Sequence, residues 1–335
     1  NVDATTLSLR AQNGLIGNHD NTNGTPAANV NAIDTRVTTL AANAENGIYI
    51  HEADGITINT VALVRVDIDV PQQVNFNDTT TSVRQVRSTS VLEDLTTDMD
   101  GPIKIVAVAG TLTIKGGTDS SGVKANGTGD VLLQAVGAAS DVVVDVTVDS
   151  GTGNITLNAG DDIDINASVT TSGTGTIYAA AANAANNAIG AEIDGINVNA
   201  IVTTGNGDVL LDSARDIRVS HAISSTDGQF GLVAARNIIQ DANGDITTGG
   251  DAFIEAGNDW TMDSDAVITA NGGEVIGAAS SGNLTLGRIN STNVALTAGS
   301  NIIDANAGSV NVNAVTLSMR AHNGMIGTNA NAIDT

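Results

Sequence analysis

The sequence predicts an all-β fold, a parallel β-helix or β-solenoid, from its composition and from a short internal repeat. Of the 335 residues, 41% are hydrophobic but only 2% are aromatic, so the apolar residues are nearly all small or branched aliphatics. The chain has 37 Gly and only 3 Pro, and Val, Ile and Thr predominate between Gly, Asn and Asp residues. β-branched residues favour strands, whereas Gly, Asn and Asp favour tight turns. This composition is typical of short strands separated by turns.

A pattern of nine residues recurs along the chain with a period of about 21 residues. In each copy, positions 1, 3 and 5 are apolar or small, position 8 is Asp or Asn, and position 9 is Ile or Trp. The clearest copies begin at Ile155, Val209, Phe230, Ala252 and Val294. The last four of these starts are separated by 21, 22 and 42 residues, and the last interval equals two units with a degenerate copy between them.

Each unit is expected to contain three short strands. In the unit that begins at Ile155, the alternation predicts strands at Ile155 to Ala159, Ile163 to Asn166 and Val169 to Thr171, with Gly, Asn or Asp at the turns. Three strands per unit make a triangular coil, and successive coils stack with parallel strands about 4.8 Å apart. Asn and Thr side chains in equivalent corners are expected to form hydrogen-bonded ladders along the axis.

One interval between units is too long for the period. The 54 residues from Ile155 to Val209 equal two units plus an insertion of roughly ten residues. The Ala-rich stretch Ala179 to Ile189 is the expected place of this insertion. Within it, Ala179 to Ala185 forms either a turn of helix or a tight loop.

A second repeat relates the two ends of the sequence. Residues 311–327 match residues 1–17 at 12 of 17 positions, and both copies then reach the sequence Asn-Ala-Ile-Asp-Thr, at 31–35 and 331–335. Residues 1–55 are expected to form coils with a loop insertion, and residues 311–335 to restart the repeat of residues 1–35. This pattern predicts tandem duplication. Because neither end resembles a polar cap, we expect the molecule to continue on both sides or to stack end to end.

The segment from 56 to 100 has no Gly, unlike the continuous solenoid expected over 101–335. Val61 to Val70 predicts a long alternating strand. The segment is either a hairpin or small subdomain that contacts a partner, or an irregular, longer coil. If it contacts a partner, its charged residues are the contact candidates: Arg65, Asp67, Asp69, Arg84 and Arg87.

The charge balance excludes one class of partner and suggests another. With 37 acidic and 13 basic residues, the net charge is −24, so nucleic-acid binding is not expected. No apolar run approaches the length of about 20 residues that a membrane span needs. Acidic turns attract divalent cations or are simply solvated, and Asp161, Asp162 and Asp164 are the candidate calcium ligands. The chain has no Cys, and its four His residues show no ligand spacing, so no other metal or cofactor is predicted.

No catalytic site is predicted. Pairs of acids such as Asp161 and Asp162 are able to supply a general acid and base, as in glycan-cleaving β-helices. Glycan grooves also use aromatic side chains, however, and this chain has one Trp, two Tyr and three Phe. Trp260 occupies the position that Ile163, Ile217 and Ile302 occupy in other units, which predicts a core residue. The chain is therefore expected not to be an enzyme.

The units at residues 153–163 and 206–217 resemble repeats of filamentous-haemagglutinin-type exoproteins and related giant repetitive bacterial surface adhesins, which use two-partner-type secretion. The resemblance implies a right-handed parallel β-helix that is secreted and displayed at the cell surface as a long fibre. The implied function is a structural repeat unit that stacks with itself into a filament or stalk. Two alternatives remain open: a β-helix that binds or cleaves carbohydrate, and a calcium-dependent surface-layer or sheath protein. The glycan or host surface that such a fibre would bind is not predicted.

Overall fold

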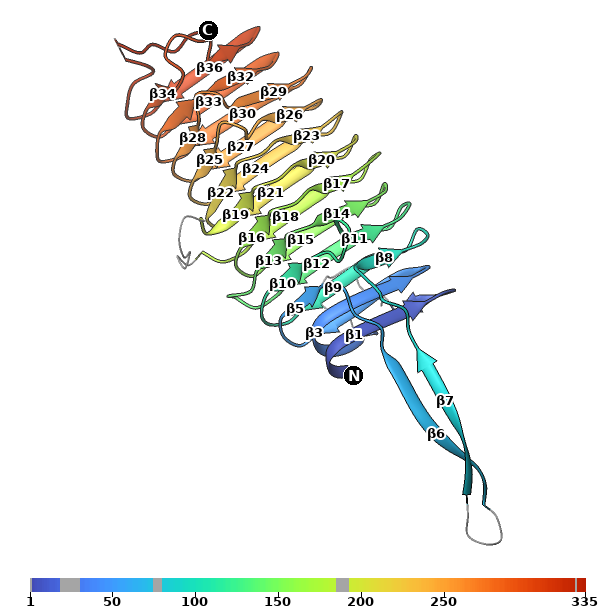
Figure 1. Ribbon diagram of the computed structural model, residues 1–335. Helices are drawn as coiled ribbons and strands as arrows, with labels where there is room; N and C mark the ends of the chain where they lie inside the picture. The colour runs from blue at the N-terminus through green and yellow to red at the C-terminus, as the bar shows by residue number, and fades with distance from the viewer. Residues whose placement is uncertain (1, 19–30, 75–79, 185–192, 329) are drawn as a thin grey trace.

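The chain is wound into a parallel β-solenoid, with one antiparallel hairpin projecting from it (Figure 1). The computed structural model describes residues 2–18, 31–74, 80–184, 193–328 and 330–335, and these residues form strands and turns but no helix. Of the 36 strands, 34 belong to one sheet that winds around the axis. The all-β solenoid predicted from the sequence is thereby confirmed.

Each coil contributes three strands, one to each of three walls. In the coil that begins at Ile155, these are β15 (Ile155–Ala159), β16 (Ile163–Ile165) and β17 (Val169–Thr171). They pair in parallel with the corresponding strands of the next coil, β18, β19 and β20. Val209 pairs with Phe230, and Phe230 with Ala252, so the partners lie 21 and 22 residues apart as predicted. The second strand ends at Ile165, one residue before the predicted end.

The three walls run along the solenoid as continuous ladders of parallel strands. The first wall contains β4 (Gly47–Glu52), β9 (Ile103–Ala107), β12 (Val131–Ala135), β15, β18 (Ile177–Ala181), β21 (Val209–Ser213), β24 (Phe230–Ala234), β27 (Ala252–Ala256), β30 (Glu274–Ala279), β33 (Asn293–Ala298) and β36 (Thr316–Ala321). The second wall contains β5 (Ile56–Ile58), β10 (Leu112–Ile114), β13 (Val142–Val144), β16, β19 (Gly195–Val198), β22 (Asp216–Val219), β25 (Ile238–Gln240), β28 (Trp260–Met262), β31 (Leu284–Leu286) and β34 (Ile302–Asp304). The third wall contains β8 (Leu95–Thr97), β11 (Ser121–Ala125), β14 (Thr147–Ser150), β17, β20 (Val202–Thr204), β23 (Ile223–Ser225), β26 (Ile246–Thr248), β29 (Val267–Ala270), β32 (Arg288–Asn290) and β35 (Val312–Asn313).

At the N-terminal end the coils are less regular. There, β3 (Ile33–Ala44) pairs in turn with β4, β5 and β8, so this one long strand passes through all three walls. It also pairs with β1 (Val2–Ala11) on its other side, while β2 (Leu15–Ile16) pairs with β4. The described strands β2 and β3 are separated by the loop insertion expected in residues 1–55, of which residues 19–30 lie outside the described part.

The core is a continuous column of aliphatic side chains inside the three walls. In β15 the residues alternate between buried and partly exposed, with Ile155, Leu157 and Ala159 facing inward. Burial of one face at a period of two is the pattern that the sequence shows at positions 1, 3 and 5. Trp260 is completely buried and pairs with Ile238 and Leu284 in the second wall, which confirms that it is a core residue.

The Ala-rich stretch begins as a strand rather than as a helix or loop. Ala179 and Ala181 are buried in β18, where Ala179 pairs with Leu157 and with Leu211 in the neighbouring coils. Of the two alternatives for Ala179 to Ala185, the turn of helix is wrong for the described residues, and the loop begins only after Ala181. The pairing of strands between adjacent coils outweighs the helix propensity of Ala. The insertion lies between β18 and β19, and residues 185–192 of it, including Ala185 and Ile189, are outside the described residues.

The Gly-free segment contains both solenoid strands and a hairpin. Its ends, β5 and β8, belong to the second and third walls. Between them, β6 (Arg65–Val74) and β7 (Thr80–Ser88) form an antiparallel hairpin that stands off the solenoid near its N-terminal end (Figure 1). An antiparallel bridge between Val61 and Leu92 closes its base. Of the two alternatives, the hairpin is thus confirmed, although its first strand begins at Arg65 and not at Val61 as predicted.

The two copies of the long repeat lie in different phases of the coil. Leu7 pairs with Leu40, which in turn pairs with Ile58 of the second wall. The matching residue of the other copy, Leu317, pairs with Val294 in the first wall. In all three walls, every second residue of a strand faces the core. The same short sequence therefore fits more than one wall, and the adjoining segments of the chain determine which wall it joins. Residues 311–335 therefore repeat the sequence of residues 1–35 without repeating its placement.

Candidate functional site

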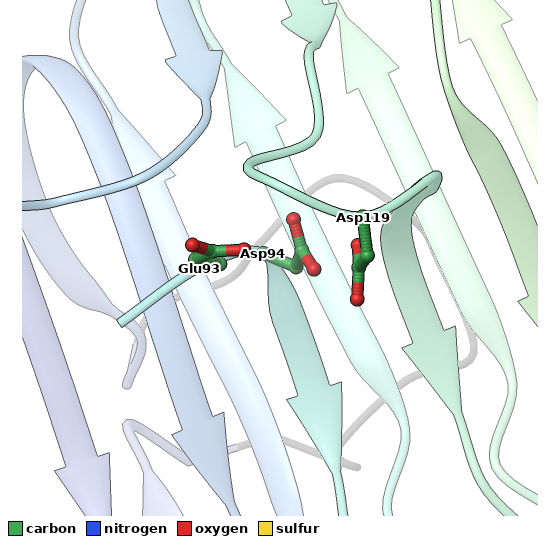
Figure 2. A group of neighbouring side chains, drawn as sticks. All are labelled: Glu93, Asp94 and Asp119. Carbon is green, nitrogen blue, oxygen red and sulfur yellow. The ribbon is translucent and has the colours of Figure 1, made fainter. Parts of the chain in front are cut away.

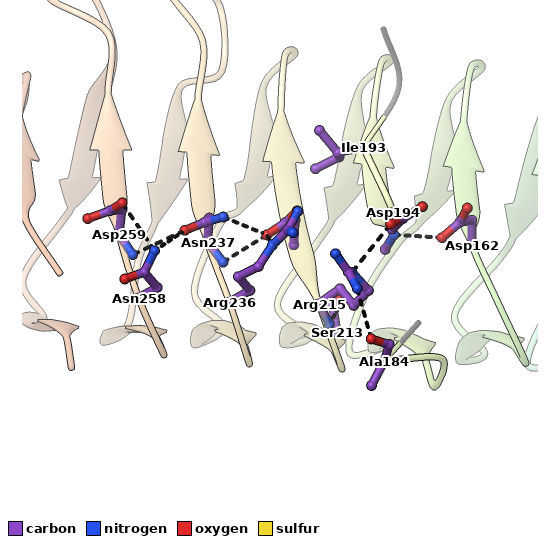
Figure 3. Close-up of polar contacts among 12 residues, drawn as sticks. Asp162, Ala184, Ile193, Asp194, Ser213, Arg215, Arg236, Asn237, Asn258 and Asp259 are labelled. Atoms are coloured by element: carbon purple, nitrogen blue, oxygen red, sulfur yellow. Dashed lines mark hydrogen bonds and ion pairs between the residues drawn. The ribbon is translucent and has the colours of Figure 1, made fainter. Parts of the chain in front are cut away.

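The Asp and Asn residues at position 8 of the repeat form a ladder along the solenoid. The Asn237 N–H donates to Asp216 Oδ1 at 2.9 Å, and the Asp259 N–H donates to Asn237 Oδ1 at 3.2 Å (Figure 3). The ladder continues as the Asn283 N–H donates to Asp259 Oδ1 at 2.7 Å. Each side chain thus accepts a hydrogen bond from the backbone of the next coil. This satisfies a corner amide that has no partner within its own coil, which explains why position 8 is Asp or Asn.

A second ladder uses buried hydroxyl groups at the end of the third wall's strands. Ser150 Oγ donates to the Gly129 carbonyl at 2.8 Å, and Ser225 Oγ donates to the Gly207 carbonyl at 2.7 Å. A Cβ on Gly207 would overlap the carbonyl oxygen of Gly175 one coil earlier, so only Gly fits in this column. Thr171 Oγ1 donates to the Gly153 carbonyl at 2.8 Å in the same column, so the predicted Asn and Thr contacts between coils are both observed.

Two arginines balance buried acids in the same corner. Arg215 Nε lies 3.4 Å from Asp194 Oδ2, and Arg236 forms an ion pair with Asp216 (Figure 3). The Arg215 guanidinium also donates to the Ala184 carbonyl at 2.8 Å. Arg215 therefore holds both Ala184 and Asp194, which lie on either side of the insertion between β18 and β19.

Three carboxylates meet one coil earlier, where no arginine is present at the equivalent position. Carboxylate oxygens of Asp141, Asp161 and Asp162 lie within 4.8 Å of one another. Of the three calcium candidates from the sequence, Asp161 and Asp162 belong to this group. Asp164 lies on β16 outside the group, and its Oδ1 accepts a hydrogen bond from Asn197 Nδ2 at 3.0 Å. Sequence reasoning missed Asp141, although it precedes Asp162 by one period at position 8.

The charge of Asp162 is poorly compensated. Burial, with the nearby carboxylates of Asp161, Asp141 and Asp194, raises the pKa of Asp162 to about 7, against a hydrogen bond from the Gly195 amide that lowers it. Each of the three grouped carboxylates nevertheless accepts a hydrogen bond within the protein. Asp162 Oδ1 accepts one from the Gly195 N–H at 2.6 Å, and Asp161 Oδ1 accepts one from Asn183 Nδ2 at 2.9 Å. Asp141 Oδ2 accepts one from Thr111 Oγ1 at 3.2 Å.

The hairpin divides its predicted contact residues between two faces. In the antiparallel register, Asp69 lies opposite Arg84, and Arg65 lies opposite Ser88, on the same face as Asp67. The Arg84 guanidinium donates to Asp67 Oδ2 at 2.6 Å, and Arg65 Nε donates to Asp67 Oδ1 at 3.0 Å. These two hydrogen bonds lower the pKa of Asp67 below its usual value, with Arg84 the larger cause. Much of the charge on this face is therefore balanced within the hairpin.

The opposite face of the hairpin is apolar and exposed. Val66 and Ile68 alternate with the acidic residues along β6 and are 52% and 55% exposed, and Val83 on β7 is 47% exposed. Arg87 pairs with Val66 and is the one predicted contact residue on this face. The alternation of Val66, Ile68 and Val70 with charged residues was the signal that could have identified this apolar face.

A shallow hollow lies beside the N-terminal coils. Its volume is about 500 Å³, and its lining includes Asp3, Asp34, Arg36 and His51. His51 Nδ1 lies 3.2 Å from Asp34 Oδ1. The hollow combines acids with a base but has no aromatic residue in its lining.

No protein-family model, curated protein or solved structure matches this chain. Within the described residues there is no helix with the length and apolar character needed to cross a membrane. The class of protein is defined by the fold alone, a parallel β-solenoid. Any statement on its function therefore depends on the contacts described above and on the sequence pattern.

Proposed function

We propose that this chain is a non-enzymatic repeat unit of a long extracellular fibre or adhesin on a bacterial surface. One observation carries the proposal: the core and the ladders between coils follow the axis through nearly the whole described chain. From β9 to β34, each coil pairs in parallel with the coil before it and the coil after it. Three ladders of parallel strands therefore join neighbouring coils along one direction.

This arrangement suits a shaft. Each junction between coils combines strand pairing in three walls with hydrogen bonds to side chains at the corners, such as the one from the Asn237 N–H to Asp216. Such a stack gains stability from nearest-neighbour contacts and remains stiff over a length set by the number of coils. The net charge of −24 favours solubility of a long exposed surface. The resemblance of the repeats to filamentous-haemagglutinin-type exoproteins supports secretion and display at the cell surface.

The proposed fibre also associates with itself through its terminal coils. Among the described strands, β1 pairs along its length with β3, and β36 pairs along its length with β33, so each has one open edge. Half-buried apolar side chains, including Leu7 and Leu317, pack against the core beside these edges. An open strand edge with adjacent apolar groups is a template for further strands. A second copy that stacks on these edges would bury them.

Electron microscopy and sedimentation test this function. Native material should contain filaments of one solenoid's width, and the isolated chain should form longer particles as its concentration rises. Leu7→Lys and Leu317→Lys place a charge beside the open edges and should reduce this association at least about tenfold, as expected when a charge blocks a strand edge. Ile276→Lys is the matched control, because Ile276 is 51% exposed on a side wall. Equal association of all the variants would contradict end-to-end stacking.

The hollow that contains Asp34 and His51 is the observation that favours the carbohydrate alternative. A β-helix that binds or cleaves glycans would show saturable binding on a glycan array or release of reducing ends, and Asp34→Asn would abolish either signal.

The calcium-dependent surface-layer alternative places calcium at Asp161, Asp162 and Asp141. It requires that chelation dissociate an ordered assembly, so assemblies that withstand a chelator would contradict it.

A further inference from the structure

Three carboxylates meet where the hairpin rejoins the solenoid. Glu93 and Asp94 lie between β7 and β8, and Asp119 lies in the turn between β10 and β11. Because β8 pairs with β11 in the third wall, this turn is adjacent to the base of the hairpin. Carboxylate oxygens of the three residues lie within 4.8 Å of one another, with Asp94 between the other two (Figure 2). We call these residues the hairpin-base acids.

The carboxylate of Asp94, which lies between those of Glu93 and Asp119, has one oxygen without a hydrogen-bond partner among the described residues. The residue is only 5% exposed, and its Oδ1 is buried without a hydrogen-bond partner among the described residues. Another buried acid shows the usual arrangement: Glu52 is fully buried and accepts hydrogen bonds from Thr35 Oγ1 and the Val37 N–H. A buried polar atom without a partner is costly, so its presence calls for a missing partner.

The missing partner should be positively charged. Burial, with the nearby charges of Asp119 and Glu93, raises the pKa of Asp94 to about 6, against a hydrogen bond from the Gly117 amide that lowers it. Among the described residues, the groups that act on this pKa include no lysine or arginine. At neutral pH the group therefore concentrates negative charge in a partly dry site, which a bound cation would neutralise.

We propose that Glu93, Asp94 and Asp119 bind a divalent cation, with Ca²⁺ preferred over Mg²⁺. Carboxylate oxygens are the ligands that Ca²⁺ uses, at about 2.3–2.6 Å, so ligands on opposite sides of one ion are about 5 Å apart. Oxygens within 4.8 Å of one another are close enough to share one such ion. Mg²⁺ demands near-ideal octahedral geometry and usually keeps several waters beside one or two protein carboxylates, so a group of three carboxylates favours Ca²⁺.

The proposed ion would join the hairpin to the next coil. Glu93 already accepts hydrogen bonds from the Thr118 N–H at 2.9 Å and from Thr118 Oγ1 at 3.1 Å, which hold its carboxylate over the turn that carries Asp119. A cation shared by Glu93, Asp94 and Asp119 cross-links the same two segments. The site is separate from the sequence-predicted calcium candidates, and the proposal stands whether or not the chain forms fibres.

Thermal melting and titration calorimetry with CaCl₂ test the site. At constant ionic strength and near neutral pH, Ca²⁺ should bind saturably and raise the Tm above its value in chelator, and MgCl₂ should have a smaller effect. Asp94→Asn should weaken Ca²⁺ binding about tenfold or more. Asn tolerates the positive φ of 63° at this position, so the variant is expected to fold. In chelator, its Tm should equal or exceed that of the wild type, because a buried charge is removed.

Two control variants locate the binding. Glu255→Gln removes an exposed acid on β27 and should leave Ca²⁺ binding unchanged. Asp162→Asn tests the other acidic group and should also leave it unchanged. If Ca²⁺ produces no saturable binding, or if Asp94→Asn binds it as tightly as the wild type, the proposal is wrong. Loss of binding in Asp162→Asn alone would place the ion at the other corner, and equal responses to Mg²⁺ and Ca²⁺ would overturn the preference for Ca²⁺.

Discussion

The core accommodates the large side chain of Trp260 because the residue of the next coil that faces its ring is a glycine, Gly277. Trp260 has no exposed surface, and its second-wall neighbours are the smaller Ile238 and Leu284. Gly277 occupies a first-wall position where the adjacent coils have Ile254 and Leu296. A Cβ on Gly277 would overlap the Trp260 ring. The extra volume of one residue is thus offset by the missing side chain of another, 17 residues later.

A double-mutant cycle tests this complementarity. Trp260→Leu should lower the free energy of unfolding by about 2–5 kcal/mol through cavity formation. Gly277→Leu should lower it by about 1–3 kcal/mol, because the added side chain overpacks the core. The double variant restores an ordinary aliphatic layer and should lose clearly less than the sum of the two. Urea unfolding followed by circular dichroism measures all four chains, and additive losses would show that the two residues do not compensate each other.

Asp162 makes stability dependent on pH. Its pKa of about 7 in the folded chain lies above the value of 3.8 for an unperturbed Asp. Between these values the folded chain binds more protons than the unfolded chain, so the contribution of Asp162 to stability decreases as pH rises from about 4 to about 7. Asn keeps the acceptor oxygen but has no charge, as Asn237 and Asn283 show at equivalent positions.

Asp162→Asn should therefore be more stable than the wild type at pH 8, by about 1–2 kcal/mol. This gain is smaller than the whole pKa shift corresponds to, because water partly screens the carboxylate. The difference should diminish towards pH 4, where Asp162 is neutral in the folded chain. Melting temperatures of both chains across this pH range provide the measurement, with Glu255→Gln as a matched neutral substitution. A lower stability of Asp162→Asn at pH 8 would contradict the expectation.

At the scale of elements, the repeating strands were predictable and the exceptions were not. The strands from Ile155 to Ala159 and from Val169 to Thr171 follow the sequence alternation because one face of each is buried. The strand that contains Ala179 gives no such signal, because consecutive Ala residues show no alternation of apolar and polar side chains. The pairing of Ala179 with Leu157 depends on the neighbouring coil. Asp141 joins Asp161 and Asp162 only because the coils stack. The orphaned oxygen of Asp94 depends on three-dimensional packing, which sequence spacing does not describe.

The hairpin should be dispensable for the fold of the solenoid. β6 and β7 pair only with each other among the described strands, and the bridge between Val61 and Leu92 closes the base. Val61 and Leu92 pack with Ala41 in a small cluster of their own. Replacing residues 63–90 with a short Gly-Ser linker should therefore change the Tm by only a few degrees, since the residues of this range whose burial is described do not belong to the core. A collapse of the β-sheet signal in circular dichroism would show that the hairpin supports the coils.

At the scale of the whole molecule, the long repeat and the coil do not have the same phase. Leu7 and Leu317 occupy corresponding positions in the sequence but pair in different walls. A coil requires only that alternate side chains of its strands face the core. The long repeat, in contrast, is recognised from identical residues in the two copies. A short strand with regular alternation satisfies any of the three walls, so sequence identity alone does not determine its place. Residues 311–335 thus repeat the sequence of residues 1–35 in a different phase of the coil.

The overall acidity should make stability depend on salt. A net charge of −24 on one chain repels itself more strongly when the coils are packed together than when the chain is unfolded. Raising NaCl from about 10 mM to about 150 mM shortens the Debye length from about 30 Å to about 8 Å. The Tm should rise over this range and then level off. A falling Tm would mean that attractive ion pairs, such as Arg236 with Asp216, outweigh the repulsion.

The position 8 ladder also bears on how the length of such a molecule changes over evolution. Each side chain in the ladder accepts from the coil that follows, and its own amide donates to the coil before, as Asn237 does between Asp216 and Asp259. A coil that is copied or deleted as a whole therefore leaves its neighbours with equivalent partners. Duplication or loss of about 21 residues would change the length in steps of about 4.8 Å and leave this ladder continuous. Insertions of other lengths must leave the wall as loops, as the hairpin does.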